Sequence, residues 1–267
     1  MIIPIAPSVT TPDTLVENIF TPAFFDTHFS LLIAQTPTEK RRAFTLRHAV
    51  FIEELRYDLG NSSALNIEHD DHDQQSLLCL LHHKATGLDV GCLRVVLFDE
   101  QNAHGLHSLP LEAYYGAHLF LPNTHPRHFA SHQVCEVSRL AVHPTVRRKQ
   151  SEVQSPYESI KESPALLSLS LFLAATALVG LSQRHHVFAM LEPRFSRLLK
   201  ASGLQFHQVG GVIDYCGSRA AYYIDQRVAE ERLPKRLTPL YQFIKGQLAS
   251  QLAKSPLLQD GGTSRQL

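Results

Sequence analysis

The stretch QVCEVSRLAVHP, from Gln133 to Pro144, determines how the rest of the chain is organised. Four of its residues are apolar: Val134, Val137, Leu140 and Val142. Glu136, Ser138 and Arg139 stand among them, at positions that a strand buried on both faces would give to apolar side chains. This predicts a central strand whose side chains alternate between the core and a cleft. A Glu and an Arg are also common on a surface strand, so the pattern alone leaves both a catalytic and a structural role open.

Length and composition indicate one large globular domain. The chain has 267 residues, of which 44% are hydrophobic, and this is enough to bury a substantial core. Lys and Arg together number 25, as do Asp and Glu, so the net charge favours neither nucleic acid nor a membrane surface as a partner.

The cysteines and the apolar segments predict a cytoplasmic protein without integral membrane association. The four cysteines lack CxxC spacing, which is typical of reduced core thiols. The N-terminus has no basic region before its short, proline-interrupted apolar run, so it is a poor signal peptide. Residues 165–181 are interrupted by serines and predict a buried helix instead of a membrane span.

Hydrophobic periodicity predicts a mixed α/β sheet. Strands are expected within 27–35, 76–83, 88–98, 133–144, 186–191, 206–213 and 220–225. Helices are expected at 37–55, 164–183, 193–201 and 239–252, with a short one near Pro110. Thr36, Pro37 and Glu39 have the order of a capped helix start. We expect residues 1–26 to be an extended N-terminal arm, 27–226 the main domain, and 227–267 a C-terminal helix and polar tail.

Four segments resemble the acyl-homoserine-lactone (autoinducer) synthases of the GNAT superfamily. FTLRHAVFIEELRY, at 44–57, resembles their first-helix signature, in which an Arg and a Phe four residues later are followed by an aromatic residue. Glu68, Asp70 and Asp73 match their acidic ExDxxD run. GCLRVV at 91–96 and CEVSRL at 135–140 are similar to their glycine-to-arginine strand and their E-x-S-R strand.

The C-terminal half resembles a neighbouring branch. Residues 191–225 are similar to the acyltransferases associated with PEP-CTERM/exosortase systems and to the long-chain N-acyl amino acid synthases. The resemblance covers roughly residues 27–226. It implies a GNAT-like fold, with a mixed central sheet flanked by helices and a cleft at the acyl-transfer strand.

The loop after this strand bears on the acyl donor. CoA-dependent GNAT enzymes bind the pyrophosphate on a glycine-containing loop, whereas residues 143–156, HPTVRRKQSEVQSP, contain no glycine. We therefore expect no tightly bound cofactor, and the acyl-phosphopantetheine of acyl carrier protein as the donor. Basic residues suit the phosphate and the acidic carrier, although a basic run is also common on a solvated surface. The candidates are Arg147, Arg148, Lys149, Arg194 and Arg197.

Forming an amide from a thioester requires a base for the amine proton and donors for the developing oxyanion. Glu136 is the expected base, directly or through water, with Ser138 and Arg139 beside it; a structural Glu136–Arg139 pair is the alternative. If the strand bulges, backbone N–H groups near Leu140 and Ala141 can polarise the thioester carbonyl. The expected donor-binding segment is completed by Val142.

The acceptor site rests mainly on the resemblance, which implies that Arg47 and Arg94 brace an acidic loop beside the acceptor pocket. Phe51 and Tyr57 are expected to line that pocket, although aromatic residues are more often plain core.

Asp70 and Asp73 can hold an ammonium group, or can belong to a solvated acidic loop. No metal site is expected, because His69 and His72 in this run have no helical i, i+4 partners.

The apolar helix at 164–183 must pack on the sheet, and its small residues are expected to leave a tunnel for a fatty chain. The residues concerned are Leu171, Leu173, Ala174, Ala175 and Leu178.

The expected function is therefore an N-acyltransferase. It would move a medium or long acyl chain from acyl carrier protein to the α-amine of an amino acid or a similar small-molecule acceptor. The alternatives are an acyl-homoserine-lactone synthase that uses S-adenosylmethionine, and a non-catalytic module that binds acyl carrier protein or lipid. The glycine-free loop disfavours a general CoA acetyltransferase.

Overall fold

A single mixed sheet organises the protein. The computed structural model describes residues 19–59, 65–98, 106–116, 120–147, 164–201 and 203–254. Seven strands lie in the order β1-β2-β3-β4-β5-β7-β6. They are β1 (Phe29–Ile33), β2 (Ser76–His83), β3 (Leu88–Leu97), β4 (Val134–Val142), β5 (His186–Leu191), β6 (His207–Asp214) and β7 (Ser218–Asp225). Neighbouring strands are antiparallel except β4 and β5, which are parallel. The expected mixed sheet is confirmed.

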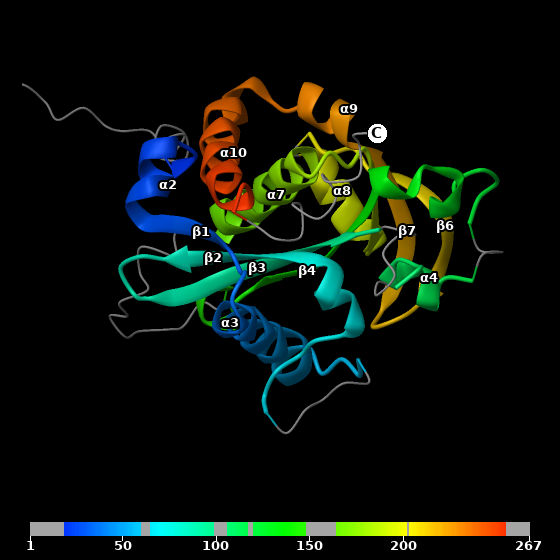
Figure 1. The fold of residues 1–267 in the computed structure, drawn as a ribbon, viewed down its shortest axis with the longest axis horizontal. Helices are drawn as coiled ribbons and strands as arrows, with labels where there is room; N and C mark the ends of the chain where they lie inside the picture. The colour runs from blue at the N-terminus through cyan, green and yellow to red at the C-terminus, as the bar shows by residue number, and fades with distance from the viewer. Residues whose placement is uncertain are drawn as a thin grey trace, which may run out of the picture.

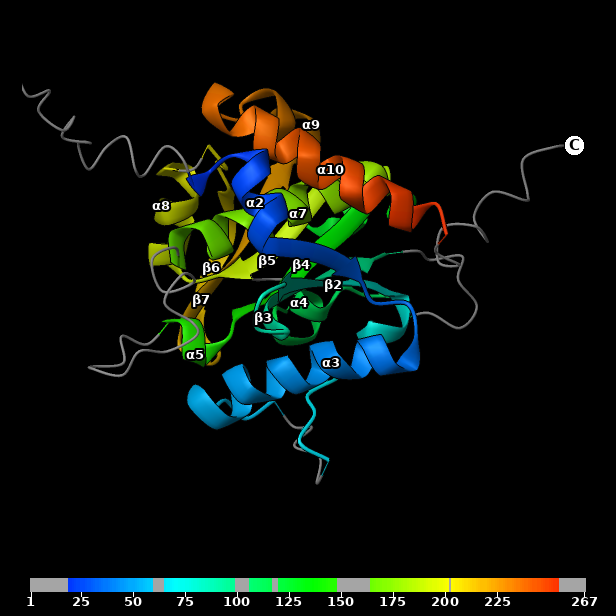
Figure 2. The ribbon, with the colours of Figure 1, turned by 90° about the vertical axis from the view of Figure 1, so that its left-hand side faces the viewer.

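Helices cover both faces of the sheet (Figures 1 and 2). On one face lie α2 (Pro22–His28), α7 (Pro164–Leu181) and α10 (Thr238–Leu252), and on the opposite face lies α3 (Pro37–Arg47). The larger core fills the α7 side, and a smaller cluster lies under α3. The remaining α-helices are α4 (Pro110–Tyr114), α5 (Pro144–Arg147), α8 (Pro193–Ala201) and α9 (Gln226–Glu231). None of the helices in the described ranges is long and apolar enough to span a bilayer.

The first long helix begins as its sequence predicts and ends differently. The Thr36 hydroxyl accepts the Glu39 N–H at 3.3 Å, and the Glu39 carboxylate accepts the Thr36 N–H at 2.9 Å. Pro37 stands at the first helical position. From His48 to Glu54, however, the backbone is π-helical, so the prediction of one α-helix up to residue 55 is wrong. This wider turn changes the direction of the side chains that follow, including that of Phe51.

Both ends of the described chain pack on the main core. An extended arm was expected up to residue 26, but residues 22–28 form α2, which is capped by the Thr21 hydroxyl. Phe25 is fully buried and meets Phe243 of α10 edge to face. Gln251 of α10 hydrogen-bonds the backbone of β1 at Ile33 and Leu31. Residues 1–18 and 255–267, the rest of the expected arm and tail, lie outside the described ranges.

A bulge interrupts β4 in the middle of its length. Cys92 pairs with Ala141 but Arg94 pairs with Ser138, so two residues of β4 face one of β3. Arg139 takes up the extra length with φ 52°, a left-handed conformation that a side chain rarely adopts. As a result Ser138 and Arg139 both point to the α3 side, and the alternation resumes with Leu140 on the α7 side. The sequence made the oxyanion donors conditional on a bulge in this strand, and the bulge is present.

The parallel pair separates soon after it begins. Only Val134, Cys135 and Glu136 of β4 have register partners on β5, at His186, Val187 and Phe188. Beyond Glu136 the two strands have no register partners across the gap between them. The gap begins at the segment of β4 that carries Glu136, Ser138 and Arg139.

Candidate active site

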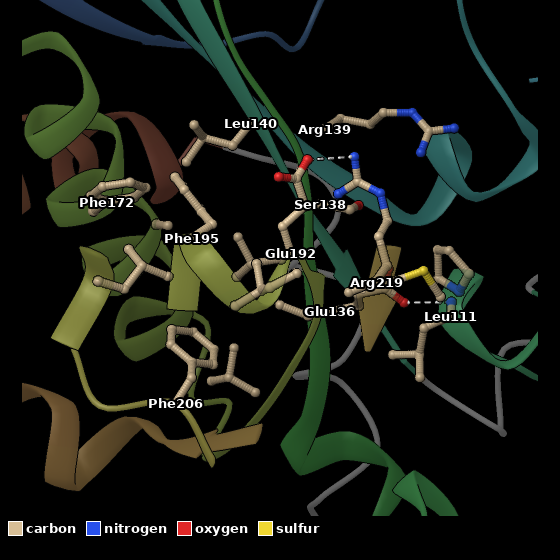
Figure 3. Close-up of a pocket in the computed structure, with 18 of the residues that line it drawn as sticks. Leu111, Glu136, Ser138, Arg139, Leu140, Phe172, Glu192, Phe195, Phe206 and Arg219 are labelled. Atoms are coloured by element: carbon tan, nitrogen blue, oxygen red, sulfur yellow. Dashed lines mark hydrogen bonds and ion pairs between the residues drawn. The ribbon is translucent and has the colours of Figure 1, made fainter. Parts of the chain in front are cut away.

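A cavity of ≈340 Å³ occupies the gap between β4 and β5 and reaches both faces of the sheet. Its apolar half is lined from the α7 side by residues of α7, α8 and the segment after α8. Its polar half contains Glu136, Ser138 and Arg139 together with side chains from other segments on the α3 side. In Figure 3, Phe172, Phe195 and Phe206 lie to one side of β4, and Arg139 and Arg219 lie to the other.

Glu136 is buried at the centre of this cavity, with 3% of its surface exposed. One oxygen of its carboxylate accepts the backbone N–H of Leu111, in the first turn of α4, at 2.8 Å (Figure 3). Burial raises the pKa of Glu136 to about 7, although the Leu111 hydrogen bond and the positive charge of Arg94 act in the opposite direction. The carboxyl group can therefore gain and lose a proton near neutral pH, as a general base must.

Behind Glu136, three arginines and three carboxylates form a nearly enclosed cluster. Arg47 binds Glu68 at 2.5 Å and Asp73 at 2.7 Å. Arg94 binds Asp70 at 2.5 Å and Asp73 at 3.1 Å, and it donates from Nε to the Ser138 hydroxyl at 3.0 Å. Arg139 binds Glu68 at 3.1 Å and Asp70 at 3.2 Å. The charges of the six side chains balance, and the cluster joins α3, the acidic loop, β3 and β4.

The pKa values of the acids follow from these pairs. Burial alone would raise the pKa of Glu68, but the charges of Arg47 and Arg139 hold it below its ordinary value. Burial likewise opposes ionisation of Asp70, and hydrogen bonding by His72 with the charges of Arg94 and Arg139 outweighs it, so the pKa of Asp70 is lowered. These acids are therefore carboxylates at neutral pH.

Asp70 and Asp73 do not line the cavity. Each of their carboxylate oxygens already accepts at least one hydrogen bond, from an arginine or from a backbone N–H group. The geometry fits the bracing role that the resemblance implied for Arg47 and Arg94, and it offers no support for direct ammonium binding by the two aspartates. Arg47 and Arg94 also lie behind the cavity wall instead of in it.

Aromatic side chains line the polar half of the cavity. Phe51 and Tyr57, both expected there, stack with ring centroids 6.3 Å apart. Tyr114 and Tyr215 form a second stacked pair at 4.0 Å. The Arg139 guanidinium lies over Phe51, with 5.9 Å between its central carbon and the ring centroid.

The expected donor-binding and tunnel residues divide into two groups. Leu140 and Ala175 line the cavity. Ala141 and Val142 do not, since after the bulge they are buried in core clusters on opposite faces of the sheet. The other four α7 residues belong to the core instead of the tunnel; they are Leu171, Leu173, Ala174 and Leu178. Arg147 ends α5, and Arg148 and Lys149 lie outside the described ranges.

Sequence analysis did not assign Arg219 or Glu192, which also line the cavity. Both fall within the 191–225 segment that carries the second resemblance. An arginine two residues after the Cys216–Gly217 turn was the available signal, but one sequence does not show which face of the strand it occupies.

The described residues contain no group of three or more His, Cys, Asp or Glu arranged to hold a metal ion. Cys79, Cys92 and Cys135 are buried as free thiols, and burial raises the pKa of each. Cys216 is a free, partly exposed thiol in the cavity wall.

The mixed sheet, with helices on both faces and a parallel strand pair that opens beside a bulge, has a GNAT-like fold. Residues 46–154, which include β4 and the acidic loop, match the family described as the acetyltransferase (GNAT) domain. This match covers less than half of the chain and agrees with its GNAT-like fold. A search of curated proteins finds no match to it.

Solved structures share the fold over most of the chain. TofI, in a ternary complex with an inhibitor and MTA, is 20% identical, with a TM-score of 0.56 over 80% of this chain and 98% of that one. FeeM, an N-acyl amino acid synthase from uncultured soil microbes, is 15% identical, with a TM-score of 0.52 over 80% and 97%. BjaI, a CoA-dependent acyl-homoserine lactone synthase with SAM and isopentyl-CoA, is 17% identical, with a TM-score of 0.51 over 81% and 89%. At these identities the likeness shows the fold.

Proposed function

We propose that this protein is an N-acyltransferase that moves a medium or long fatty acyl chain from acyl carrier protein to the amine of an amino acid or a similar small acceptor. The observation that carries the proposal is the cavity, which joins an apolar half to a polar half at Glu136. An enzyme that brings a fatty thioester and a polar amine together needs both environments to meet at one carbonyl carbon.

The apolar half suits the acyl chain. Phe172 and Phe195 meet edge to face at 5.6 Å, and Leu199 and Phe206 add to the same wall. Fatty chains are bound mainly through burial of apolar surface, which contributes about 0.8 kcal/mol per methylene group. The thioester carbonyl would then lie at the gap, beside Glu136 and the bulge.

The chemistry follows from this placement. The amine nitrogen attacks the thioester carbonyl carbon and passes its proton to Glu136, directly or through a water molecule. Backbone N–H groups at the bulge, where Arg139 and Leu140 have no register partners on β3, are the proposed donors to the oxyanion. The tetrahedral intermediate collapses to the amide and expels the phosphopantetheine thiolate, which takes up the proton.

The outer face of α8 supports a carrier protein as the donor. Arg194 and Arg197 are exposed one turn apart on this helix, while Phe195 and Leu199 of the same helix line the cavity. Among the described residues neither arginine has an ion-pair partner. A basic face on the helix that bounds the acyl cavity can steer an acidic carrier toward it.

The first test offers the purified protein acyl carrier proteins and CoA thioesters bearing chains of about 8 to 18 carbons, with a pool of amino acids and S-adenosylmethionine. Mass spectrometry identifies the products. We expect N-acyl amino acids made from the carrier-bound donors, and about a 10²- to 10⁴-fold lower rate with Glu136→Gln. Glu231→Gln, an exposed change on α9, is the matched control and should not alter the rate.

Any other outcome would change the proposed acceptor, the proposed donor or the assignment as an enzyme. An acyl lactone made from S-adenosylmethionine would identify the autoinducer-synthase alternative, and turnover of CoA thioesters alone would exclude the carrier protein. Binding of acylated carrier without any product would leave the non-catalytic module as the function.

A further inference from the structure

Arg219 stands at the start of β7, in the wall of the same cavity as Glu136 (Figure 3). The preceding turn holds it through backbone carbonyl groups: Nε donates to Tyr215 at 3.0 Å and Nη2 donates to Cys216 at 3.3 Å. Cys216 and Gly217 both have positive φ, 51° and 95°, and this tight turn presents the two carbonyl groups to the guanidinium. The side chain is therefore fixed mainly by neutral partners.

The charge of Arg219 is compensated far less than that of the other arginines at the site. Arg47, Arg94 and Arg139 each bind two carboxylates of the enclosed cluster. The acidic partner of Arg219 is Glu192, at 3.5 Å, and the side chain of Glu192 is 49% exposed. Within the part of the chain that the structure describes, Nη1 of Arg219 has no hydrogen-bond partner.

The surroundings place Arg219 at the acceptor end of the cavity. Its Nη2 donates to the Tyr57 hydroxyl at 3.2 Å, and its central guanidinium carbon lies 5.8 Å from the centroid of the Tyr57 ring. Tyr57 stacks on Phe51 in the polar half, away from the phenylalanines of the apolar half. An anion bound to Arg219 would thus share a chamber with the amine that Glu136 deprotonates.

We propose that Arg219 binds the carboxylate of the acceptor, so the acceptors of this enzyme are amino acids with a free α-carboxylate; this inference rests on the proposed acyl transfer. The Nη1 and Nη2 edge of a planar guanidinium matches a carboxylate through paired, charge-assisted hydrogen bonds, and in Arg219 this edge meets Glu192 only at 3.5 Å, from Nη2. Glu192 occupies the site weakly in the absence of acceptor and is displaced when the acceptor carboxylate binds. The α-amine is then held on the side of Glu136.

The test compares two mixtures: the proteinogenic amino acids, and the same set as α-carboxamides. These differ only at the group that Arg219 is proposed to bind. We expect the wild type to acylate the acids about 10- to 100-fold more efficiently than the amides, with the difference in KM. Arg219→Gln should remove this preference by raising KM for the acids alone, and Arg219→Lys should restore part of it.

Glu192→Gln keeps the proposal testable if the Arg219 variants fold poorly. Removing the competing charge should lower KM for the acids a few-fold and leave that for the amides unchanged. Arg227→Gln is the matched control, because Arg227 is exposed and pairs with Asp225 outside the cavity. An acid preference that survives in Arg219→Gln would overturn the proposal, and so would a wild type that acylates both mixtures equally. A change in KM for the donor alone would assign Arg219 to the donor phosphate instead.

A measurement without donor separates this proposal from the proposed function. The acid mixture should raise the unfolding temperature of the wild type but not of Arg219→Gln, and the amide mixture should raise neither. If this pattern appears while no product forms with any donor, acyl transfer is excluded and the carboxylate site stands. If products form equally from both mixtures, acyl transfer stands and the carboxylate site at Arg219 is excluded.

Discussion

Glu136 combines a nearly complete loss of solvent with one direct hydrogen bond to its carboxylate from the residues that the structure describes, donated by the Leu111 N–H group. This balance explains why its pKa lies at about 7, whereas arginines hold the pKa values of Glu68 and Asp70, in the cluster behind it, below their ordinary values. Glu136 and the acids of the cluster thus have different roles: Glu136 titrates near neutral pH, and the cluster holds the acidic loop in place.

The pKa of Glu136 predicts the pH profile of the reaction. The base acts only when ionised, so kcat/KM for acyl transfer should rise with pH through about 7, in addition to the rise that deprotonation of the acceptor amine causes. Residual activity of Glu136→Gln should lack this rise and keep only the titration of the acceptor amine. A profile that is the same in both proteins would exclude Glu136 as the base.

The same pKa has a consequence for folding. A carboxyl group whose pKa is raised in the folded state binds more protons folded than unfolded between about pH 4.5 and 7, so its contribution to stability is lost as pH rises. Between about pH 4 and pH 8, the free energy of unfolding of the wild type should therefore fall by about 3 kcal/mol relative to that of Glu136→Gln. Denaturant titrations at the two pH values check that the titrating group is Glu136.

At the scale of elements, the acidic loop, α3, β3 and β4 meet in a cluster that lies almost entirely out of water. Removing one member leaves buried charges without a partner, which costs more than the pair contributes when intact. Within this cluster, one oxygen of Asp73 accepts hydrogen bonds from two arginines, Arg47 and Arg94.

Asp73→Asn should lower the free energy of unfolding by about 3 to 5 kcal/mol, because both arginines lose a charge partner in a buried site. Urea denaturation at neutral pH measures the change. Asp26→Asn provides the control, since the Asp26–Lys84 pair is exposed and should contribute less than about 1 kcal/mol. Equal losses in the two variants would contradict a structural role for the cluster.

The strands were predictable because their apolar periodicity is local, and each of the seven lies close to its expected range. The capped start of α3 was predictable for the same reason. The helix at 22–28 was not, because it packs against α10, which is distant in the sequence. The π-helical turn after Arg47 was not predicted either. At the site, Glu136, Phe51 and Tyr57 could be named from motifs. Arg219 could not, since its place in the cavity depends on how β7 pairs with β5, on the side of β5 away from β4.

At the scale of the whole molecule, the cavity connects the two faces of the sheet, so each half is built by different helices. On the α7 side the helix presents a small residue, Ala175, among larger ones. The length and bulk of the bound acyl chain should depend on such positions.

Ala175→Phe should shift the preferred donor toward shorter chains and raise KM for the longest ones several-fold, because the larger ring fills part of the apolar half. Competition between acyl donors of different length, read by mass spectrometry, gives the profile. Ala165→Phe makes the same change at an exposed position on the same helix and should leave the profile unaltered. A profile unchanged in a folded Ala175→Phe protein would place the acyl chain elsewhere.

The short join between β4 and β5 also bears on how the molecule moves. Three registered residue pairs connect two plates, one of β1 to β4 and the other of β5, β7 and β6. Each plate keeps its own antiparallel hydrogen bonds if the angle between the plates changes, so tilting breaks few hydrogen bonds between strands. The distance between the cavity walls can therefore change more easily than the structure of either wall. A bound acyl chain would set the angle between the two plates as well as fill the space between the walls.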